Sequence, residues 1–529
     1  MKKITTLFLI LATAVSLYAQ SAEDALSIAD ERYEGTARSM AMGNAFTALG
    51  GDLGGLAINP AASGVFRCSQ FTFTPSFTGT RSSVNYLGNT QNTGNVGLTL
   101  SNVGAVLSFD TGNYTGLLNY SFGFVYNKKN SFRSKMAAYG TTSESSMLGA
   151  LANELGEVYR DDETGKWVGI TKESLEETNN PYAVYPANLW PNILAWNAKA
   201  LAPLYLNGEE TEYMYIGSTE NFDEDKYVIY IGGPLDQRFN RKTYGSLEEF
   251  SFNFGGNFGD FLYFGANLNV ETLSRTVEEF YEEKARNYND FQDGFVSMDN
   301  SYWLRTSGAG ANFKFGVIVT PFAGLRLGAT FTTPTWYTLT DQWDYTMNAE
   351  YYNNKDKAFK TQTKQTPTGS YSYKLTAPMR WSVGAAYTFW DRALLSVDFE
   401  RVNYSKTRYY IDHRTEGDFS AINREINNYY LNANIIRTGA EVRVSRLISL
   451  RGGFQYYTPS SVYGVSTRVY SAGIGFNISE RTAIDLAWNR SSSRTDQFQL
   501  YGDYDGLTAP IGSDTHRMSH VACTFSFKF

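Results

Sequence analysis

The most persistent pattern along the chain is an alternation of apolar and polar residues with a period of two. Between residues 118 and 126, one face collects Leu118, Tyr120, Phe122, Phe124 and Tyr126, while Asn119, Ser121 and Gly123 fall on the other. Successive side chains of a β-strand point to opposite faces, so this pattern predicts a strand with one apolar and one polar face. The last residues alternate in the same way and end on Phe529.

Repeated alternation predicts fourteen strands, an even number as bacterial single-chain barrels require. The predicted strands lie near residues 69–78, 96–109, 116–128, 247–258, 261–275, 301–316, 324–337, 374–389, 393–408, 430–445, 448–458, 468–479, 482–493 and 517–529.

Two fold classes fit alternating strands: a transmembrane β-barrel and an exported soluble β-sandwich. The apolar faces are rich in aromatic residues, as in the girdles of membrane barrels, and a chain that stops on an aromatic residue inside a strand suits a barrel whose last strand closes on the first. The sequence therefore favours an all-β transmembrane antiparallel barrel.

The N-terminus predicts export. Met1, Lys2 and Lys3 precede an apolar run over residues 4–17, and Ala19 supplies a small residue before Gln20. This is the pattern of a signal peptide, predicted over residues 1–19. The alternative, an uncleaved anchor helix, is disfavoured because the apolar run is too short to span a bilayer. The predicted location is the bacterial outer membrane.

Composition excludes several other classes. The chain has 529 residues, with 46 Lys and Arg against 53 Asp and Glu, a net charge of -7, and only two Cys. These values argue against a nucleic-acid binder, a disulfide scaffold and a four-thiolate zinc site. The chain shows no phosphate loop, nucleophile elbow or zinc-protease motif, so we expect no enzymatic activity, metal or cofactor.

A barrel of this size needs something to fill it. About 16 strands leave an aqueous channel, and fourteen should leave a sizeable lumen. Residues 20–67 do not alternate. They contain a helix-compatible stretch over residues 37–49, two Gly pairs and the sequence Asn59-Pro60-Ala61, and they are predicted to form an N-terminal hatch that plugs the barrel of residues 68–529. The connection 132–245 is predicted to be a large extracellular insertion with a helix-like piece from Ser145 to Leu155.

Residues 35–64 read GTARSMAMGNAFTALGGDLGGLAINPAASG, and this segment resembles the hatch of the outer-membrane transporters for long-chain fatty acids and aromatic hydrocarbons, the FadL/TodX family. The barrel segments LTAPMRWSVGAAYTF, RALLSVDFERVNYS, RTGAEVRVSRLISLRGGFQYY and YSAGIGFNISERTAIDLAW resemble later strands of that family. The resemblance does not cover the insertion.

The resemblance implies a 14-stranded barrel with the hatch inside, a hydrophobic small-molecule ligand, and contact with outer-membrane lipid and lipopolysaccharide. Family members release ligand sideways, through a gap at a kink in the third strand. That kink is expected here near Gly112, Asn113, Gly116 and Gly123; for Gly112 and Gly116 the alternative is an ordinary turn. Hatch gating is expected at Asn59, Pro60 and Ala61, with Gly43 and Phe46; the alternative for the Asn-Pro pair is a tight turn entering the first strand.

Parity also places charged residues on the inner face: Arg380, Asp398, Glu400, Glu441, Arg443, Arg451 and Asp485. Arg380, Arg443 and Arg451 are candidates for binding a ligand carboxylate. The alternative is that these charges pair with one another or with the hatch. Parity points Cys68 inward and Cys523 toward lipid, so no disulfide is expected between them.

The leading functional hypothesis is passive transport of hydrophobic compounds, long-chain fatty acids or similar molecules, through a hatch-gated barrel with a lateral exit. The alternative is a barrel scaffold or shuttle that binds exported proteins of a secretion system at its extracellular loops. An apolar pocket against the hatch would favour transport, and a wide lumen open to the outside would favour a protein partner.

Overall fold

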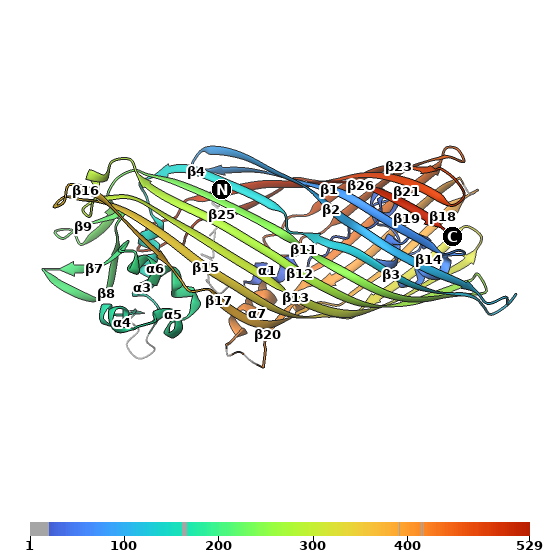
Figure 1. Ribbon diagram of the computed structural model, residues 1–529, viewed down its shortest axis with the longest axis horizontal. Helices are drawn as coiled ribbons and strands as arrows, with labels where there is room; N and C mark the ends of the chain where they lie inside the picture. Colours follow the sequence, from blue (N-terminus) through green and yellow to red (C-terminus); the bar gives the residue numbers. More distant parts are fainter. Residues whose placement is uncertain (1–20, 161–166, 391, 414, 416) are drawn as a thin grey trace, which may run out of the picture.

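The computed structural model describes residues 21–529, apart from 161–166, 391, 414 and 416. The predicted signal peptide lies outside the described residues. Figure 1 shows an elongated barrel of long tilted strands, with a separate group of helices and short strands at one end. Within the described residues, no helix is both long enough and apolar enough to cross a membrane.

The barrel wall is closed and antiparallel, which confirms the predicted fold class. We call each passage of the chain along the wall a stave. Each stave pairs with the next, and the last pairs with the first. In order around the barrel, the 14 principal strands are β1(Gln70–Tyr86), β2(Asn89–Asp110), β3(Leu117–Ser131), β11(Leu235–Phe258), β12(Leu262–Ala285), β13(Phe295–Phe322), β14(Leu325–Thr332), β18(Arg380–Phe389), β19(Ala393–Asn403), β21(Asn432–Arg443), β22(Ile448–Tyr457), β23(Thr467–Asn477), β24(Thr482–Ser491) and β26(Ile511–Lys528).

Two predicted strands are each divided by a proline. The stave predicted over 324–337 is β14 followed by β15(Thr335–Asn353), with Pro334 between them. The stave predicted over 374–389 is β17(Gly369–Ala377) followed by β18, with Pro378 between them. Proline has no N–H to donate to a ladder, so each stave breaks there although the alternation of side chains continues on both sides.

Several strands run well beyond their predicted ends, so the insertion is shorter than predicted. β4(Ser134–Thr142) and the start of β11 belong to the wall, which leaves residues 143–234, here called the cap. The cap lies at the end of the barrel away from the C-terminus (Figure 1). It contains α3(Met147–Gly156), α4(Lys172–Glu177), α5(Pro181–Val184), α6(Trp190–Asn197) and the hairpins β5(Tyr159–Arg160)–β6(Trp167–Val168), β7(Leu201–Leu206)–β8(Glu209–Gly217) and β9(Glu220–Asp223)–β10(Val228–Ile231). The helix predicted from Ser145 is α3, and the Ser146 side chain caps it.

Other extensions of the wall lie in or beside connections predicted as loops, and they are β16(Ala358–Gln365), β20(Arg408–Ile411) and β25(Arg494–Gln499). The connection after β20 also contains a helix, α7(Ser420–Tyr429).

Residues 21–67, here called the lumenal segment, lie inside the barrel (Figure 1). They form α1(Ala22–Ala29), α2(Ala37–Ala41), η1(Gly54–Ala57) and η2(Pro60–Val65). The helix expected over 37–49 is only the short α2. Nearly every residue from Thr36 to Gly64 is buried, and many are Ala or Gly, which suits a segment that packs closely against surrounding strands.

The outer face of the wall carries a belt of exposed aromatic and aliphatic side chains. Members on neighbouring staves include Phe73, Phe77, Leu98, Phe122, Phe124, Phe252, Phe254, Phe313, Phe315, Trp488 and Val521. A contiguous apolar belt of this extent has no role in water and is the surface that a bilayer covers.

Candidate functional site in the barrel lumen

Glycines of the wall fit the lumenal segment. On nine staves, a glycine faces inward at a point where an added Cβ would come within 3 Å of the segment. These residues are Gly123, Gly255, Gly265, Gly316, Gly328, Gly384, Gly439, Gly453 and Gly473. These glycines thus leave the room that the segment occupies.

Gly43 and Phe46 lie at this contact. Gly43 has φ of 60°, and an added Cβ would strike the backbone of Thr438 and Phe454 in the wall. The Phe46 ring is fully buried, with the Arg38 guanidinium 5.7 Å from its centre. Both residues fix the segment against the wall; the structure does not test a gating role for them.

Asn59 joins three parts of the lumen. Its side-chain oxygen accepts a hydrogen bond from the Ala61 N–H at 2.9 Å, which caps η2. Its Nδ2 donates to the Thr47 carbonyl at 2.6 Å and to the Val317 carbonyl of β13 at 3.2 Å. Pro60 follows as the first residue of η2, and its carbonyl accepts from Asn253 of β11 at 3.0 Å. The Asn-Pro pair is therefore a fixed joint between segment and wall, and its role as a gate stays a prediction.

Replacing Asn59 with Ala should loosen this joint. The substitution removes a cap and leaves the buried Thr47 carbonyl unpaired, so we expect the free energy of unfolding to fall by about 1–3 kcal/mol. Thermal unfolding of the detergent-solubilised protein measures this. Asn113→Ala, in an exposed turn, is the control and should leave the midpoint unchanged; equal midpoints for both variants would contradict the assignment.

The glycines predicted to mark a lateral kink lie in two different places. Gly112, Asn113 and Gly116 lie in the turn between β2 and β3, where Gly112 and Gly116 have positive φ of 73° and 77°. Gly123 lies inside β3, pairs with Val106 and Asn253, and contacts Leu56 of the lumenal segment. The glycines therefore serve a turn and a close contact, and a lateral opening at them stays a prediction.

The wall is interrupted farther along the same two staves. The ladder between β2 and β3 ends at the pair Asn102 and Asn127. Beyond it, β3 pairs with the lumenal segment instead: the Arg32 N–H donates to the Lys129 carbonyl at 2.7 Å, and the Glu34 N–H to the Lys128 carbonyl at 3.1 Å.

We call this interruption the seam. It lies between residues 89–101 of β2 and residues 128–142 of β3 and β4. No backbone–backbone hydrogen bond among the described residues crosses it: the Arg133 guanidinium donates to Asn95 Oδ1 at 3.3 Å, and the Thr93 hydroxyl donates to the Lys135 carbonyl. The seam is thus the one stretch of the described barrel wall in which two neighbouring staves lack a backbone ladder over this length.

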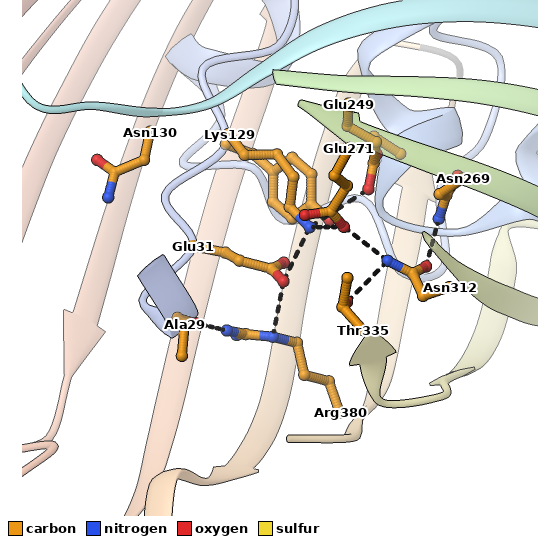
Figure 2. Close-up of polar contacts among 12 residues, drawn as sticks. Ala29, Glu31, Lys129, Asn130, Glu249, Asn269, Glu271, Asn312, Thr335 and Arg380 are labelled. Carbon is orange, nitrogen blue, oxygen red and sulfur yellow. Dashed lines mark hydrogen bonds and ion pairs between the residues drawn. The ribbon is translucent and has the colours of Figure 1, made fainter. Parts of the chain in front are cut away.

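A buried network of charges crosses the lumen beside the segment (Figure 2). The Lys129 ammonium lies 2.8 Å from Glu31 of the segment, 2.7 Å from Glu271 of β12 and 3.4 Å from Glu249 of β11. All four side chains are at most 5% exposed. One cation thus holds three carboxylates from three elements together.

The network continues on the opposite wall through arginines. Arg380 lies 3.3 Å from Glu31 and 3.1 Å from Glu400. Arg437 of β21 pairs with Glu400 at 2.8 Å. Burial would raise the pKa of the Glu31 carboxyl, but the charges of Arg380, Lys129 and Lys314 lower it to about 2, so Glu31 is ionised at neutral pH.

The three predicted head-group arginines have different environments. Arg380 is fully paired within the network. Arg451 lies 2.6 Å from Glu441 and 2.5 Å from Asp485, and Arg38 of the segment also reaches Glu441, at 2.9 Å. For both Arg380 and Arg451, the structure therefore shows the alternative that the sequence left open, which is pairing with neighbouring charges and with the segment.

Arg443 is exposed at the end of β21, where it pairs with Ser449 of β22 on the same face of the sheet as Glu441 and Arg451. It has no ion pair among the described residues, and its role in binding a ligand carboxylate stays a prediction. Cys68 is likewise exposed ahead of β1 rather than inward; both cysteines are free.

Sequence analysis missed the centre of the network. Glu249, Glu271 and Arg437 lie on inward positions of predicted strands, so parity alone would have found them. Parity does not identify Lys129. The ladder between β3 and β11 shifts register there, since Leu247 pairs with Asn130 and Glu248 with Lys128, so the alternation of inner and outer side chains along β3 changes at Lys129.

A small cavity lies beside the network. It measures about 20 Å³ and is lined by residues that include Glu31, Tyr33, Lys314, Arg380 and Arg437. A space of this size holds about one water molecule. Next to it, α1 packs among tyrosines of the wall: Tyr337, Tyr373, Tyr404 and Tyr409. The apolar pocket and the wide open lumen that sequence analysis considered both stay predictions.

The cap is docked through buried carboxylates. Glu283 of β12 accepts hydrogen bonds from the Met147 N–H at 2.9 Å and the Ser146 hydroxyl at 3.0 Å, both at the start of α3. Glu220 of the cap lies nearby and accepts from the Gly217 N–H at 2.9 Å. Burial, helped by the nearby charges of Asp505 and Glu283, raises the pKa of Glu220 to about 7, although the hydrogen bonds that it accepts from Gly217 and Tyr504 lower it.

Docking of the cap should therefore weaken as pH rises. A carboxyl whose pKa is raised from its ordinary 4.5 to about 7 binds its proton more tightly in the docked state. The free energy of docking therefore falls as the pH rises from 4.5 to about 7 and stays constant above that pH. The expected loss is of order 2–3 kcal/mol. Limited proteolysis of residues 143–234 at about pH 5 and about pH 8 measures it. Glu220→Gln should remove most of the difference, and an unchanged pH response in that variant would contradict the proposal.

The fold has known relatives among solved structures. A FadL homologue from Pseudomonas aeruginosa superposes with a TM-score of 0.53 at 11% sequence identity, covering 94% of this chain and 98% of the other. The toluene transporters TodX of P. putida and TbuX of Ralstonia pickettii match with TM-scores of 0.48 and 14% identity, covering 94% of this chain and 99% of theirs. No protein-family model and no curated protein sequence matches the chain.

The likeness to the FadL homologue establishes the class of fold. The chain is a FadL-like closed barrel of 14 staves. At this level of identity, the likeness speaks for the fold alone.

Proposed function

We propose that this protein is an outer-membrane channel for the passive passage of hydrophobic compounds. The observation that carries the proposal is the combination of an outward apolar belt with a lumen filled by the chain's own N-terminal segment, in the fold of the FadL homologue. A porin for polar solutes needs an open aqueous lumen, whereas the chain's own N-terminal segment lies in this lumen against the wall.

The seam is the proposed exit. A hydrophobic compound gains about 0.8 kcal/mol per CH₂ on leaving water, so release directly into the bilayer avoids an aqueous step and needs no energy source. The part of the seam farther from the cap includes the exposed belt residues Val96 and Leu98 of β2. Gating by the segment is part of the proposal, because its residues 32–34 hold the edge of β3 that β2 leaves free.

The experiment locks the seam with a disulfide. In a background with Cys68→Ser and Cys523→Ser, the pair Thr93→Cys and Lys135→Cys joins the two sides of the seam. The control pair, Thr80→Cys and Met518→Cys, joins β1 and β26 where they are already paired. Uptake of a radiolabelled long-chain fatty acid and of toluene is measured in cells, with and without reductant.

We expect oxidation of the seam pair to reduce uptake at least about tenfold, reversibly, and oxidation of the control pair to leave it unchanged. Unchanged uptake with a fully formed seam disulfide would refute the lateral exit. No uptake by the reduced protein above an empty-vector strain, for any hydrophobic probe, would refute transport itself.

A second candidate function, binding of an exported protein, rests on the cap. Its hairpins expose apolar side chains to solvent, including Trp167, Tyr205, Met214, Tyr227 and Tyr230. Exposed aromatic residues of this kind mark contact surfaces for other proteins. Cross-linking in intact cells from p-benzoyl-phenylalanine at position 205 or 227 tests it, and an exported protein captured at both positions, but not from position 463 of the exposed Tyr463, would favour this function.

A further inference from the structure

Four arginines lie side by side on the outer surface of the barrel, at the edge of the apolar belt. They are Arg81 of β1, Arg517 of β26, Arg490 of β24 and Arg468 of β23, on four consecutive staves. By strand parity they share the outer face with the exposed belt residues Phe77, Val521, Trp488 and Tyr470. Each lies two or four residues from its belt neighbour, toward the cap end of the stave.

The register brings the four charges close together. Arg81 and Arg517 are direct cross-strand partners. Arg490 pairs with Ser519, which makes it the diagonal neighbour of Arg517. Arg490 also pairs with Tyr470, which makes Arg468 its diagonal neighbour on the other side. Direct partners have Cβ atoms about 5 Å apart and diagonal ones about 7–8 Å, within reach of a guanidinium.

No carboxylate balances these charges. Among the described residues, none of the four guanidinium groups has an ion pair. The nearest acidic residues of the same staves, Asp496 and Asp514, belong to the inner face, where Asp514 accepts from the Ser82 hydroxyl at 2.5 Å and Asp496 pairs with Arg494 at 2.9 Å. Like charges directly opposite each other destabilise a sheet, so a row of four unpaired arginines is costly unless an anion lies on it.

We propose that this arginine row binds the phosphate groups of lipid in the outer leaflet. The proposal rests on the outer-membrane location proposed above. The row lies at the boundary where the belt ends, which is the depth of lipid headgroups, and arginine forms bidentate hydrogen bonds with phosphate. The acyl chains of the same lipid would cover Phe77, Val521, Trp488 and Tyr470. A lipid with two phosphates, such as lipid A, matches the row better than a lipid with one.

The test compares two double variants. Arg81→Gln with Arg517→Gln removes the centre of the row. Arg305→Gln with Arg401→Gln removes two outward arginines on β13 and β19 whose cross-strand partners are uncharged. Native mass spectrometry and thermal unfolding in a neutral detergent measure binding of bis-phosphorylated lipid A, dephosphorylated lipid A and inorganic phosphate.

We expect wild type and the control variant to retain bis-phosphorylated lipid A and to gain thermal stability from it. The row variant should bind it at least about tenfold more weakly. Dephosphorylated lipid A should bind weakly to all three proteins. Equal retention by the row variant would overturn the proposal, and stabilisation by inorganic phosphate alone would assign the row to a free anion instead of a lipid.

The outcome is independent of transport. Neither of the two replaced arginines, Arg81 and Arg517, lines the lumen or the seam, so uptake by the row variant reconstituted in phosphatidylcholine vesicles should equal that of wild type. Loss of lipid binding with normal uptake, or absent uptake with normal lipid binding, separates the failure of this inference from the failure of the proposed function.

Discussion

Replacing Lys129 with Met should destabilise the barrel by about 3–5 kcal/mol, the usual cost of removing one partner from a buried ion pair. Lys129 is the only cation within 4 Å of Glu249 and Glu271 among the described residues, and it also holds Glu31. Without it, these carboxylates share a dry site, and burial would force protonation or let water into the lumen. Chemical denaturation in detergent, followed by tryptophan fluorescence, measures the loss.

The neighbouring residue provides the control for this variant. Lys128 is buried and has no ion pair in the described part of the chain, so Lys128→Met should cost much less. The double variant Lys129→Met with Glu271→Gln should recover part of the loss, because one of the unbalanced charges is removed. If Lys129→Met and Lys128→Met cost the same, the network does not hold the segment in the lumen.

Replacing Gly453 with Val should displace the lumenal segment and open the barrel. An added Cβ at Gly453 would overlap the backbone of Met42 and Gly43. Overpacking costs about 1–3 kcal/mol, and the segment can relieve it by moving away from the wall, which leaves an aqueous channel. We expect single-channel conductance in planar bilayers from this variant and none from wild type.

The adjacent glycine makes a matched control. Gly452 lies on the same strand, faces outward and has nothing within 4 Å of an added Cβ. Gly452→Val should therefore fold normally and stay closed. A conductance that appears with both variants, or with neither although both fold, would contradict the assignment of Gly453 as a contact for the segment.

Local pattern alone was enough to predict the barrel. Strand periodicity identified every one of the principal staves at least in part, because each must keep one face for lipid and one for the lumen. The predicted boundaries were short at the cap end, since the staves there leave the belt and lose their strong contrast between faces. The strands on either side of Pro334 and of Pro378 were each predicted as one strand, because the alternation of apolar and polar side chains continues across the proline although the hydrogen-bond ladder does not.

The candidate site was predicted only in part. Parity correctly placed Arg380 and Arg451 in the lumen, but it could not tell which carboxylates they meet, because partners such as Glu31 and Asp485 come from distant parts of the chain. It missed Lys129, which lies beside a register shift. The glycines chosen for a lateral kink mark a turn and a close contact instead.

By itself, the sequence determined the class of wall, the inner and outer faces of its strands and the presence of a small-residue segment ahead of the first strand, because these follow from periodicity and composition within short stretches. Only the tertiary structure decided which glycines meet the segment, how one lysine balances three carboxylates, and where the wall parts into a seam. Each of those features depends on the register between elements far apart in the chain, and register is set by closure of the whole barrel.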